Sequence, residues 1–234
     1  MFPLNPLPIL NTMAVSSVDG RRYYTLPDGT SYPSVTTVIG EYLPKEHLKE
    51  WKERVGEEEA SKITTQASKR GNSVHELCEE YLRGNLTPKI LMRAMPINVE
   101  SFRKIQKELD KYIDEVNAIE YPAYSHKLRT AGRIDNASRW NKRNSIVDFK
   151  TSRYLKDESY ILGYFLQTTA YSMMIEEMLG LHFPQIVVVI AVDHEPVQIF
   201  VKERKDYEEQ VISAFVAKRR EWEYKLKSMD RLST

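Results

Sequence analysis

The stretch that decides the fold is TAGRIDNASRW (130–140), followed by NKRN (141–144) and SIVDFKT (145–151). The outer two pieces alternate apolar and polar residues and contain β-branched side chains, which favours two strands. The four polar residues between them are typical of a short hairpin connection. This region therefore predicts an antiparallel hairpin at the centre of the molecule.

The register of that hairpin decides which side chains meet. If the four-residue loop closes symmetrically, Trp140 faces Ser145 and Asp135 faces Lys150. Because side chains alternate across a strand, Asp135, Asp148 and Lys150 then project from one face of the hairpin. The register thus predicts two carboxylates and one ammonium group within a few ångströms of one another.

Two close carboxylates repel each other unless a cation joins them, and hard oxygen ligands suit Mg²⁺ or Mn²⁺. Such an ion can hold a phosphate and activate a bound water, while a neighbouring lysine offsets the charge that develops on the phosphate oxygens. The grouping therefore suits phosphodiester hydrolysis. The alternative is a structural ion cluster on the solvated face of an exposed hairpin.

Composition narrows the class of protein. The 234 residues carry 34 Lys+Arg against 33 Asp+Glu, so the net charge of +1 argues against a protein that coats nucleic acid. The length predicts one domain, or two small ones, and no apolar run approaches a membrane span. The single cysteine, Cys78, excludes an internal disulfide framework and a cysteine-rich zinc site.

The remaining chain alternates between helical and strand patterns, which favours an α/β sandwich around a mixed sheet. Strands are expected at 22–26, 34–39, 120–128, 185–192 and 197–201, the third as an edge or bulged strand because of Pro122. Helices are expected at 46–65, from a start near Gly71 to an end at Gly84, and at 99–116, 159–179 and 207–226.

Two further motifs accompany the hairpin and lead to a resemblance. The segment RGNSVHELCE (70–79) resembles a Gly-x-x-x-His helix, and QTTAY (167–171) matches a Gln-x-x-x-Tyr helix. With Asp135 and the DFK sequence at 148–150, they resemble the PD-(D/E)xK nuclease superfamily in its RecB-like exonuclease branch. Tyr32-Pro33-Ser34-Val35-Thr36 and the DFKTS ending (148–152) make the chain most similar to the mitochondrial genome maintenance exonucleases and their bacteriophage relatives.

The resemblance implies a restriction-endonuclease-like core, a central mixed sheet flanked by helices, over roughly residues 30–180. It implies that His75, Asp135, Asp148 and the backbone carbonyl of Phe149 hold Mg²⁺ or Mn²⁺, and that Lys150 is the catalytic lysine. It also implies that the helix of Gln167 and Tyr171 lines the site. We expect DNA contacts from Arg70, Ser34, Thr36, Arg133, Thr151, Ser152, Gln167 and Tyr171.

Two positions depart from the pattern of the superfamily, and a third is a further acidic residue near the site. Ile134 stands where the name-giving proline of the superfamily would be, and Asn72 replaces a threonine often found after the helix-entry glycine. Glu120, on the strand before the hairpin, is a further acidic residue that we leave outside the primary set of ligands.

Together with this resemblance, the sequence predicts a metal-dependent DNA exonuclease in which a metal-bound water attacks the phosphate with help from Lys150. The resemblance implies a preference for single-stranded ends. We expect one nuclease domain over 1–234, with the segment at about 20–117 packed on a catalytic core at about 118–234. We also expect a monomer with no membrane partner. The N-terminus resembles no transit peptide, so we expect a cytoplasmic phage protein rather than a mitochondrial one.

The alternatives to this function are a structure-specific endonuclease, a catalytically silent DNA-binding subunit, or a soluble protein with an ion-paired hairpin.

Overall fold

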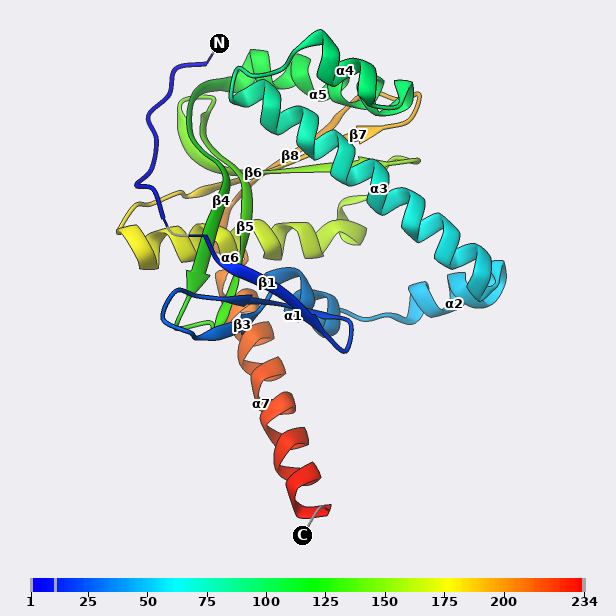
Figure 1. Ribbon diagram of the computed structural model, residues 1–234, viewed down its shortest axis with the longest axis vertical. Coiled ribbons are helices and arrows are strands. Elements are labelled where there is room, and N and C mark those ends of the chain that lie inside the picture. Colours follow the sequence, from blue (N-terminus) through cyan, green and yellow to red (C-terminus); the bar gives the residue numbers. More distant parts are fainter. Residues whose placement is uncertain (1, 11, 233–234) are drawn as a thin grey trace.

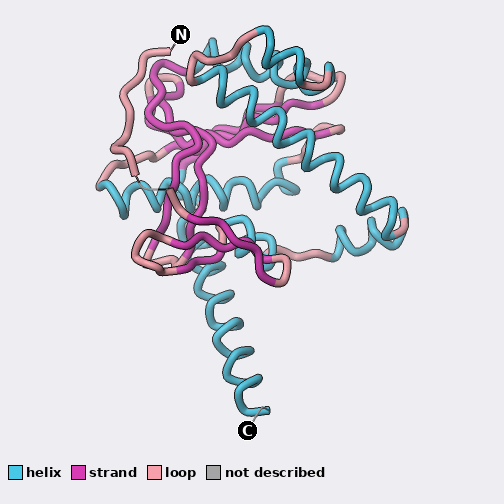
Figure 2. The backbone as a smooth tube through the Cα atoms, in the orientation of Figure 1, coloured by secondary structure: helices cyan, strands magenta, loops and turns pink. Residues whose placement is uncertain are grey.

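In the computed structural model, residues 2–10 and 12–232 are described, and their strands form two sheets (Figures 1 and 2). The larger sheet has the order β4 (Ile113–Ser125), β5 (Thr130–Trp140), β6 (Arg143–Ser152), β7 (Gln185–Val192) and β8 (Gln198–Glu203). Strands β6 and β7 are parallel and the other neighbours antiparallel, so this sheet is mixed, as predicted. The smaller sheet consists of β1 (Ala14–Val18), β2 (Arg21–Thr25) and β3 (Ser31–Pro33).

Helices cover both faces of the large sheet. On one face, α3 (Glu57–Leu82) and α5 (Pro96–Tyr112) share a buried apolar cluster with β6 and β7. On the other, α1 (Val35–Tyr42), α6 (Leu162–Leu179) and the start of α7 (Glu208–Leu232) pack on β4, β5 and β6. Shorter helices complete the chain: α2 (Glu46–Val55), α4 (Pro88–Arg93), η1 (Glu158–Ile161) and η2 (Arg204–Asp206). The predicted α/β sandwich is therefore confirmed. No described helix combines the length and the apolar character needed to cross a membrane.

The central hairpin forms where the sequence predicts it, but with a tighter turn. Trp140 pairs with Arg143 rather than Ser145, so the connection is Asn141-Lys142 and not the four residues expected. Both turn residues have positive φ, 48° and 66°, as a two-residue turn that matches the twist of the strands requires. The predicted register is therefore wrong by two residues. Because two is the side-chain period of a strand, Asp135, Asp148 and Lys150 keep their predicted common face.

Strands β5 and β6 separate at the acidic residues, a point we call the fork. The last pair is Asn136 with Val147, and the next residue on each strand, Asp135 on β5 and Asp148 on β6, is no longer paired across the gap. Beyond the fork, β5 stays paired with β4 as far as Thr130, while β6 follows β7 as far as Ser152. Figure 1 shows β4 and β5 running toward the small sheet while β6, β7 and β8 take another direction. The fork exposes the facing edges of both strands, which leaves room for polar side chains between them.

Three local predictions are corrected by the structure. The run at 34–39 is helix α1 rather than a strand, because the Ser34 side chain accepts a hydrogen bond of 3.0 Å from the Thr37 backbone N–H and so starts a helix. The helix expected at 46–65 is interrupted at Gly56, whose φ of 82° suits glycine. Gly71 lies inside α3 and does not begin a helix.

Other boundaries shift where the sheet competes with helical spacing. The helix expected to reach residue 116 ends at Tyr112, since Ile113 begins β4 and pairs with Trp140. Strand β4 is an edge strand of its sheet with register shifts between 113 and 118, in line with the bulged edge strand expected nearby. The elements expected at 185–192 and 159–179 are confirmed, the latter as η1 and α6, and those at 197–201 and 207–226 become β8 and α7. Strand β1 is not anticipated by the sequence reasoning.

The cap of α1 leads to a stability prediction. Ser34→Ala removes the acceptor for the Thr37 N–H, so we expect the free energy of unfolding to fall by about 1 kcal/mol. Ser34→Asn, which keeps a capping oxygen, should retain most of the stability. Urea denaturation measures both, with the exposed Ser17→Ala as a control expected to stay within about 0.5 kcal/mol of wild type. A loss equal to that of the control would show that the cap is not needed.

Candidate metal centre

Helix α3 places His75 over the fork. Val74, Leu77 and Cys78 of the same helix are buried in the cluster with β6 and β7, which orients the next side chain toward the strands. The His75 Nε2 atom lies 2.5 Å from the backbone carbonyl oxygen of Phe149, and its Nδ1 atom lies 3.3 Å from Asp135 Oδ2. An imidazole, a carboxylate and a backbone carbonyl expected as ligands from the sequence are thus gathered in one place.

The Asp135 carboxylate also spans the gap between the separated strands. Its Oδ2 atom accepts a hydrogen bond of 3.1 Å from the Phe149 backbone N–H. This bond replaces the strand-to-strand pairing that is lost at the fork, so it fixes the carboxylate against β6.

Asp148 is the buried carboxylate of the centre. Its residue is only 2% exposed, and its Oδ1 atom accepts a hydrogen bond of 2.8 Å from the Gln167 side chain. The Lys150 ammonium forms an ion pair with Oδ2. Lys150 also lies 5.1 Å from the centre of the Tyr164 ring. The two oxygens of the carboxylate are therefore held by two different elements, α6 and β6.

Glu120 joins the centre through an unusual backbone conformation. Its φ is 50°, in the left-handed region that a glutamate seldom adopts, and it lies on β4 between residues paired to Asn136 and Ile134. Single ligand atoms of His75, Glu120 and Asp135 all lie within 4.8 Å of one another. An imidazole nitrogen with two carboxylate oxygens is a donor set that fits a divalent cation. The sequence prediction left Glu120 outside the primary set of ligands, but the structure places it with His75 and Asp135.

Burial and mutual repulsion change the pKa values of these groups. Burial and the Asp135 charge raise the pKa of Asp148 to about 6 against the attraction of Lys150. Burial, with the charges of Asp135 and Glu79, raises the pKa of Glu120 to about 7. Burial also acts to raise the pKa of Asp135, but His75, Lys150 and the Phe149 N–H outweigh it, and its pKa is lowered. Excess negative charge is thus gathered where a bound cation would compensate it.

Most of the residues expected at the site line one cavity of about 700 Å³. From the sequence prediction it includes Ser34, Thr36, His75, Arg133, Asp135, Lys150, Gln167 and Tyr171, while Asp148 lies buried beneath it. Three further lining residues, Val15, Arg22 and Tyr24, come from the small sheet. No spacing in the sequence signals them, because only tertiary packing brings β1 and β2 to the fork.

Tyr171 forms part of the back of this cavity and depends on Gly132. A Cβ atom added at Gly132 would lie 2.7 Å from Cε1 of the Tyr171 ring, closer than two carbons can approach. Tyr171 is 5% exposed, so its ring has little freedom to move away. The glycine in the GRID sequence (132–135) is thus explained by the close approach of helix α6 to strand β5.

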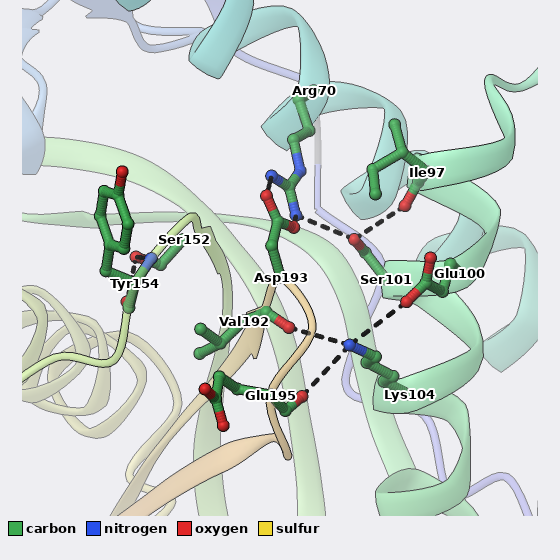
Figure 3. A network of polar contacts seen from close by, with 10 residues as sticks. All are labelled: Arg70, Ile97, Glu100, Ser101, Lys104, Ser152, Tyr154, Val192, Asp193 and Glu195. Carbon is green, nitrogen blue, oxygen red and sulfur yellow. Dashed lines mark hydrogen bonds and ion pairs between the residues drawn. The ribbon is translucent and has the colours of Figure 1, made fainter.

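Arg70, Thr151 and Ser152 are expected at the site from the sequence, but the structure does not bring them to this cavity. They line a separate groove against a different face of α3. The Arg70 guanidinium forms an ion pair with Asp193 and donates a hydrogen bond of 3.0 Å to the Ser101 hydroxyl, as Figure 3 shows. In this arrangement Arg70 connects parts of the fold rather than pointing toward the fork.

The contacts of Arg70 belong to a network that docks α3 (Figure 3). Lys104 of α5 donates hydrogen bonds of 3.0 and 3.1 Å to the backbone carbonyls of Val192 and Glu195. Together with the pairing of Arg70 to Asp193, these bonds tie the β7–β8 turn to both α3 and α5. Since His75 follows Arg70 on the same helix, the network also fixes the position of the imidazole.

The raised pKa of Glu120 predicts a pH dependence of stability in EDTA. The folded chain keeps the Glu120 proton up to about pH 7, whereas the unfolded chain loses it near its ordinary pKa of 4.5. The folded state therefore binds more protons in this window, and its free energy of unfolding falls as pH rises through it. Glu120→Gln removes this effect, so relative to the variant the wild type should lose on the order of 1–2 kcal/mol between pH 4.5 and pH 8.

Urea denaturation at both pH values measures this difference, and comparison with the variant cancels the titration of other groups. The exposed Glu209→Gln, on α7, is the matched control and should track the wild type at both pH values. A constant difference between wild type and Glu120→Gln would show that Glu120 has an ordinary pKa.

Comparisons with known proteins add little to this geometry. A scan against protein-family models finds no match, and a search of the curated proteins finds none. Among solved structures, the chain is similar to a crystal structure of a "Putative exonuclease" from Eubacterium rectale, with a TM-score of 0.45 and 13% sequence identity. The match covers 62% of this chain and 63% of that one, so this chain spans less than two thirds of that protein's length. A similarity of this size assigns neither a family nor an activity to this chain.

Proposed function

We propose that this protein is a divalent-metal-dependent DNA exonuclease of the PD-(D/E)xK type that acts as a monomer on single-stranded ends. The observation that carries the proposal is the gathering of His75, Asp135 and the Phe149 carbonyl at the fork, with Asp148 paired to Lys150 beside them. These are the residues that the sequence resemblance nominates, and they come from separate elements, α3, β5 and β6.

The cation would be Mg²⁺ or Mn²⁺, held by His75, Asp135, Asp148 and the Phe149 carbonyl. Carboxylate and carbonyl oxygens favour these hard ions, and the approach of ligand atoms of His75, Glu120 and Asp135 within 4.8 Å of one another supports the fit. When bound, the ion supplies a water of lowered pKa and polarises the scissile phosphate.

Lys150 acts in this proposal as a cation rather than as a resting base. Burial acts to lower its pKa, but the neighbouring carboxylates of Asp148 and Asp135 outweigh burial and raise it. A protonated ammonium in the wall of the cavity can donate hydrogen bonds to a phosphate oxygen and offset the charge that develops there. Through its hydrogen bond to Asp148, Gln167 keeps that carboxylate in place, and Arg133 adds a positive charge at the mouth.

Cleavage assays on Asp148→Asn and Lys150→Ala test the centre directly. We expect Asp148→Asn to abolish cleavage, and Lys150→Ala to lower kcat by about 100-fold or more, as loss of one transition-state donor does. DNA binding should remain largely intact in both. The controls are Asp206→Asn and Lys107→Ala, exposed residues outside the cavity that should retain wild-type rates. Survival of activity in either site variant would remove that residue from the mechanism.

Substrate topology separates the proposal from its alternatives. With Mg²⁺ or Mn²⁺ present, we expect end-labelled linear single strands to be degraded, circular single strands to persist, and EDTA to stop the reaction. Cleavage of circles at a similar rate would identify an endonuclease with the same centre. DNA binding without cleavage of any form would identify a catalytically silent subunit.

A further inference from the structure

A second hollow begins where the candidate metal centre ends. It has a volume of about 720 Å³ and lies between the small sheet and α1. We call it the N-terminal groove and define it by Ser16, Ser17, Arg22, Thr36, Gly40 and Lys45.

The N-terminal groove adjoins the cavity of the metal centre. Val15, Arg22 and Thr36 line both hollows, so the two lie side by side against the same three residues. The Ser34 backbone is bridged to Ala131 of β5, and Thr130 donates a hydrogen bond of 2.9 Å to the Pro33 carbonyl. These contacts hold the start of α1 against the strand that carries Asp135. The groove therefore has a fixed position relative to the fork.

Part of the lining of the groove consists of small polar side chains and backbone. Ser16 and Ser17 belong to β1, whose residues are all exposed, and Thr36 and Gly40 are exposed on α1. A Cβ atom added at Gly40 would meet no atom within 4 Å, so open space lies above this glycine. Hydroxyl groups and a bare backbone can approach a chain closely without long side chains that would read its sequence.

The charge of the groove favours a polyanion. Among the residues that the structure describes, the side chains of Arg22 and Lys45 have no hydrogen-bond or ion-pair partner. By contrast, Arg21 is neutralised by Glu41, with its Nε atom 2.6 Å from the carboxylate. Two unpaired cations therefore stand against the single unpaired carboxylate of Asp19. Phosphates are the groups that such cations bind without regard to sequence.

We propose that the N-terminal groove binds the single-stranded polynucleotide next to the phosphate at the metal centre, with Arg22 and Lys45 contacting its backbone phosphates. This inference rests on the proposed nuclease activity and names a subsite of it. Arg22, which lines both hollows, contacts the nearer phosphate, and Lys45, which lines only the groove, contacts one farther along the strand. Recognition is by backbone, so the subsite adds affinity without sequence preference.

The test compares a long substrate with one too short to enter the groove. The long substrate is a linear single strand of about 20 nucleotides, more than the site sizes usual for single-strand binding folds. The short one is thymidine 5′-(4-nitrophenyl phosphate), which offers a single phosphodiester. The groove variant is Lys45→Gln, which changes a residue that lines only the groove, and Arg22→Gln with Lys45→Gln adds the residue that lines both hollows. The matched controls are Lys107→Gln and Lys89→Gln with Lys107→Gln, which remove the same charges from exposed positions of α5 and α4.

For Lys45→Gln, we expect kcat/KM on the long strand to fall at least about 3-fold through KM, while hydrolysis of the short ester is unchanged. For Arg22→Gln with Lys45→Gln, kcat/KM on the long strand should fall at least about 10-fold. In EDTA, the slope of log K against log salt for the strand should fall by about 0.7 for one lost phosphate contact and by about 1.4 for two. The controls should leave these quantities at wild-type values.

Each of the other outcomes contradicts either the groove inference or the proposed function. If the wild type cleaves both substrates and the groove variant matches its control on the long strand, the groove inference is wrong and the nuclease proposal stands. If Lys45→Gln lowers the hydrolysis of both substrates equally, Lys45 acts at the metal centre and not in a subsite, and the groove inference is wrong. If the wild type cleaves neither substrate, the proposed function fails, and the inference fails with it.

Discussion

The separation of β5 and β6 at the fork is the constraint on which the rest of the site depends. A regular sheet would pair these strands throughout and leave Asp135 and Asp148 as ordinary neighbours on its surface. Because the pairing stops at Asn136 and Val147, the two carboxylates face a gap in the sheet. The Phe149 N–H, released from the ladder, donates to Asp135 instead. The same backbone groups that would stabilise a sheet are thus used to hold a charged site.

Holding this charge at the fork has a cost that the surrounding elements offset. Burial and the charge of Asp135 raise the pKa values of Asp148 and Glu120, and the positive φ of Glu120 adds backbone strain. Strained, desolvated acidic groups persist only where packing leaves them no alternative. Here α6 fixes Asp148 through Gln167, and α3 brings His75 to Asp135 from the opposite layer. The sandwich of helices is therefore what allows the acidic groups to remain together.

The helix that carries His75 is positioned by contacts made elsewhere. Arg70, in the centre of α3, pairs with Asp193 at the turn between β7 and β8. That turn is joined to α5 through Lys104, so both helices on this face are tied to the same point (Figure 3). At the other end of the site, the small sheet lines both the cavity and the N-terminal groove. The candidate site is thus assembled from both halves of the chain.

By itself, the sequence determined the sandwich, the central hairpin, and the common face of Asp135, Asp148 and Lys150, because strand alternation is a local property. The prediction of this common face is correct although the predicted loop length is wrong, because a register error of two residues leaves the alternation of side chains unchanged. Only the tertiary structure decided that Ser34 starts a helix, that Arg70 pairs with Asp193, and that Glu120 lies beside His75. Each of these depends on partners distant in the chain or on a single cap, neither of which leaves a periodic signal. The fork was decided in the same way, because a strand's sequence does not record where its neighbour turns away.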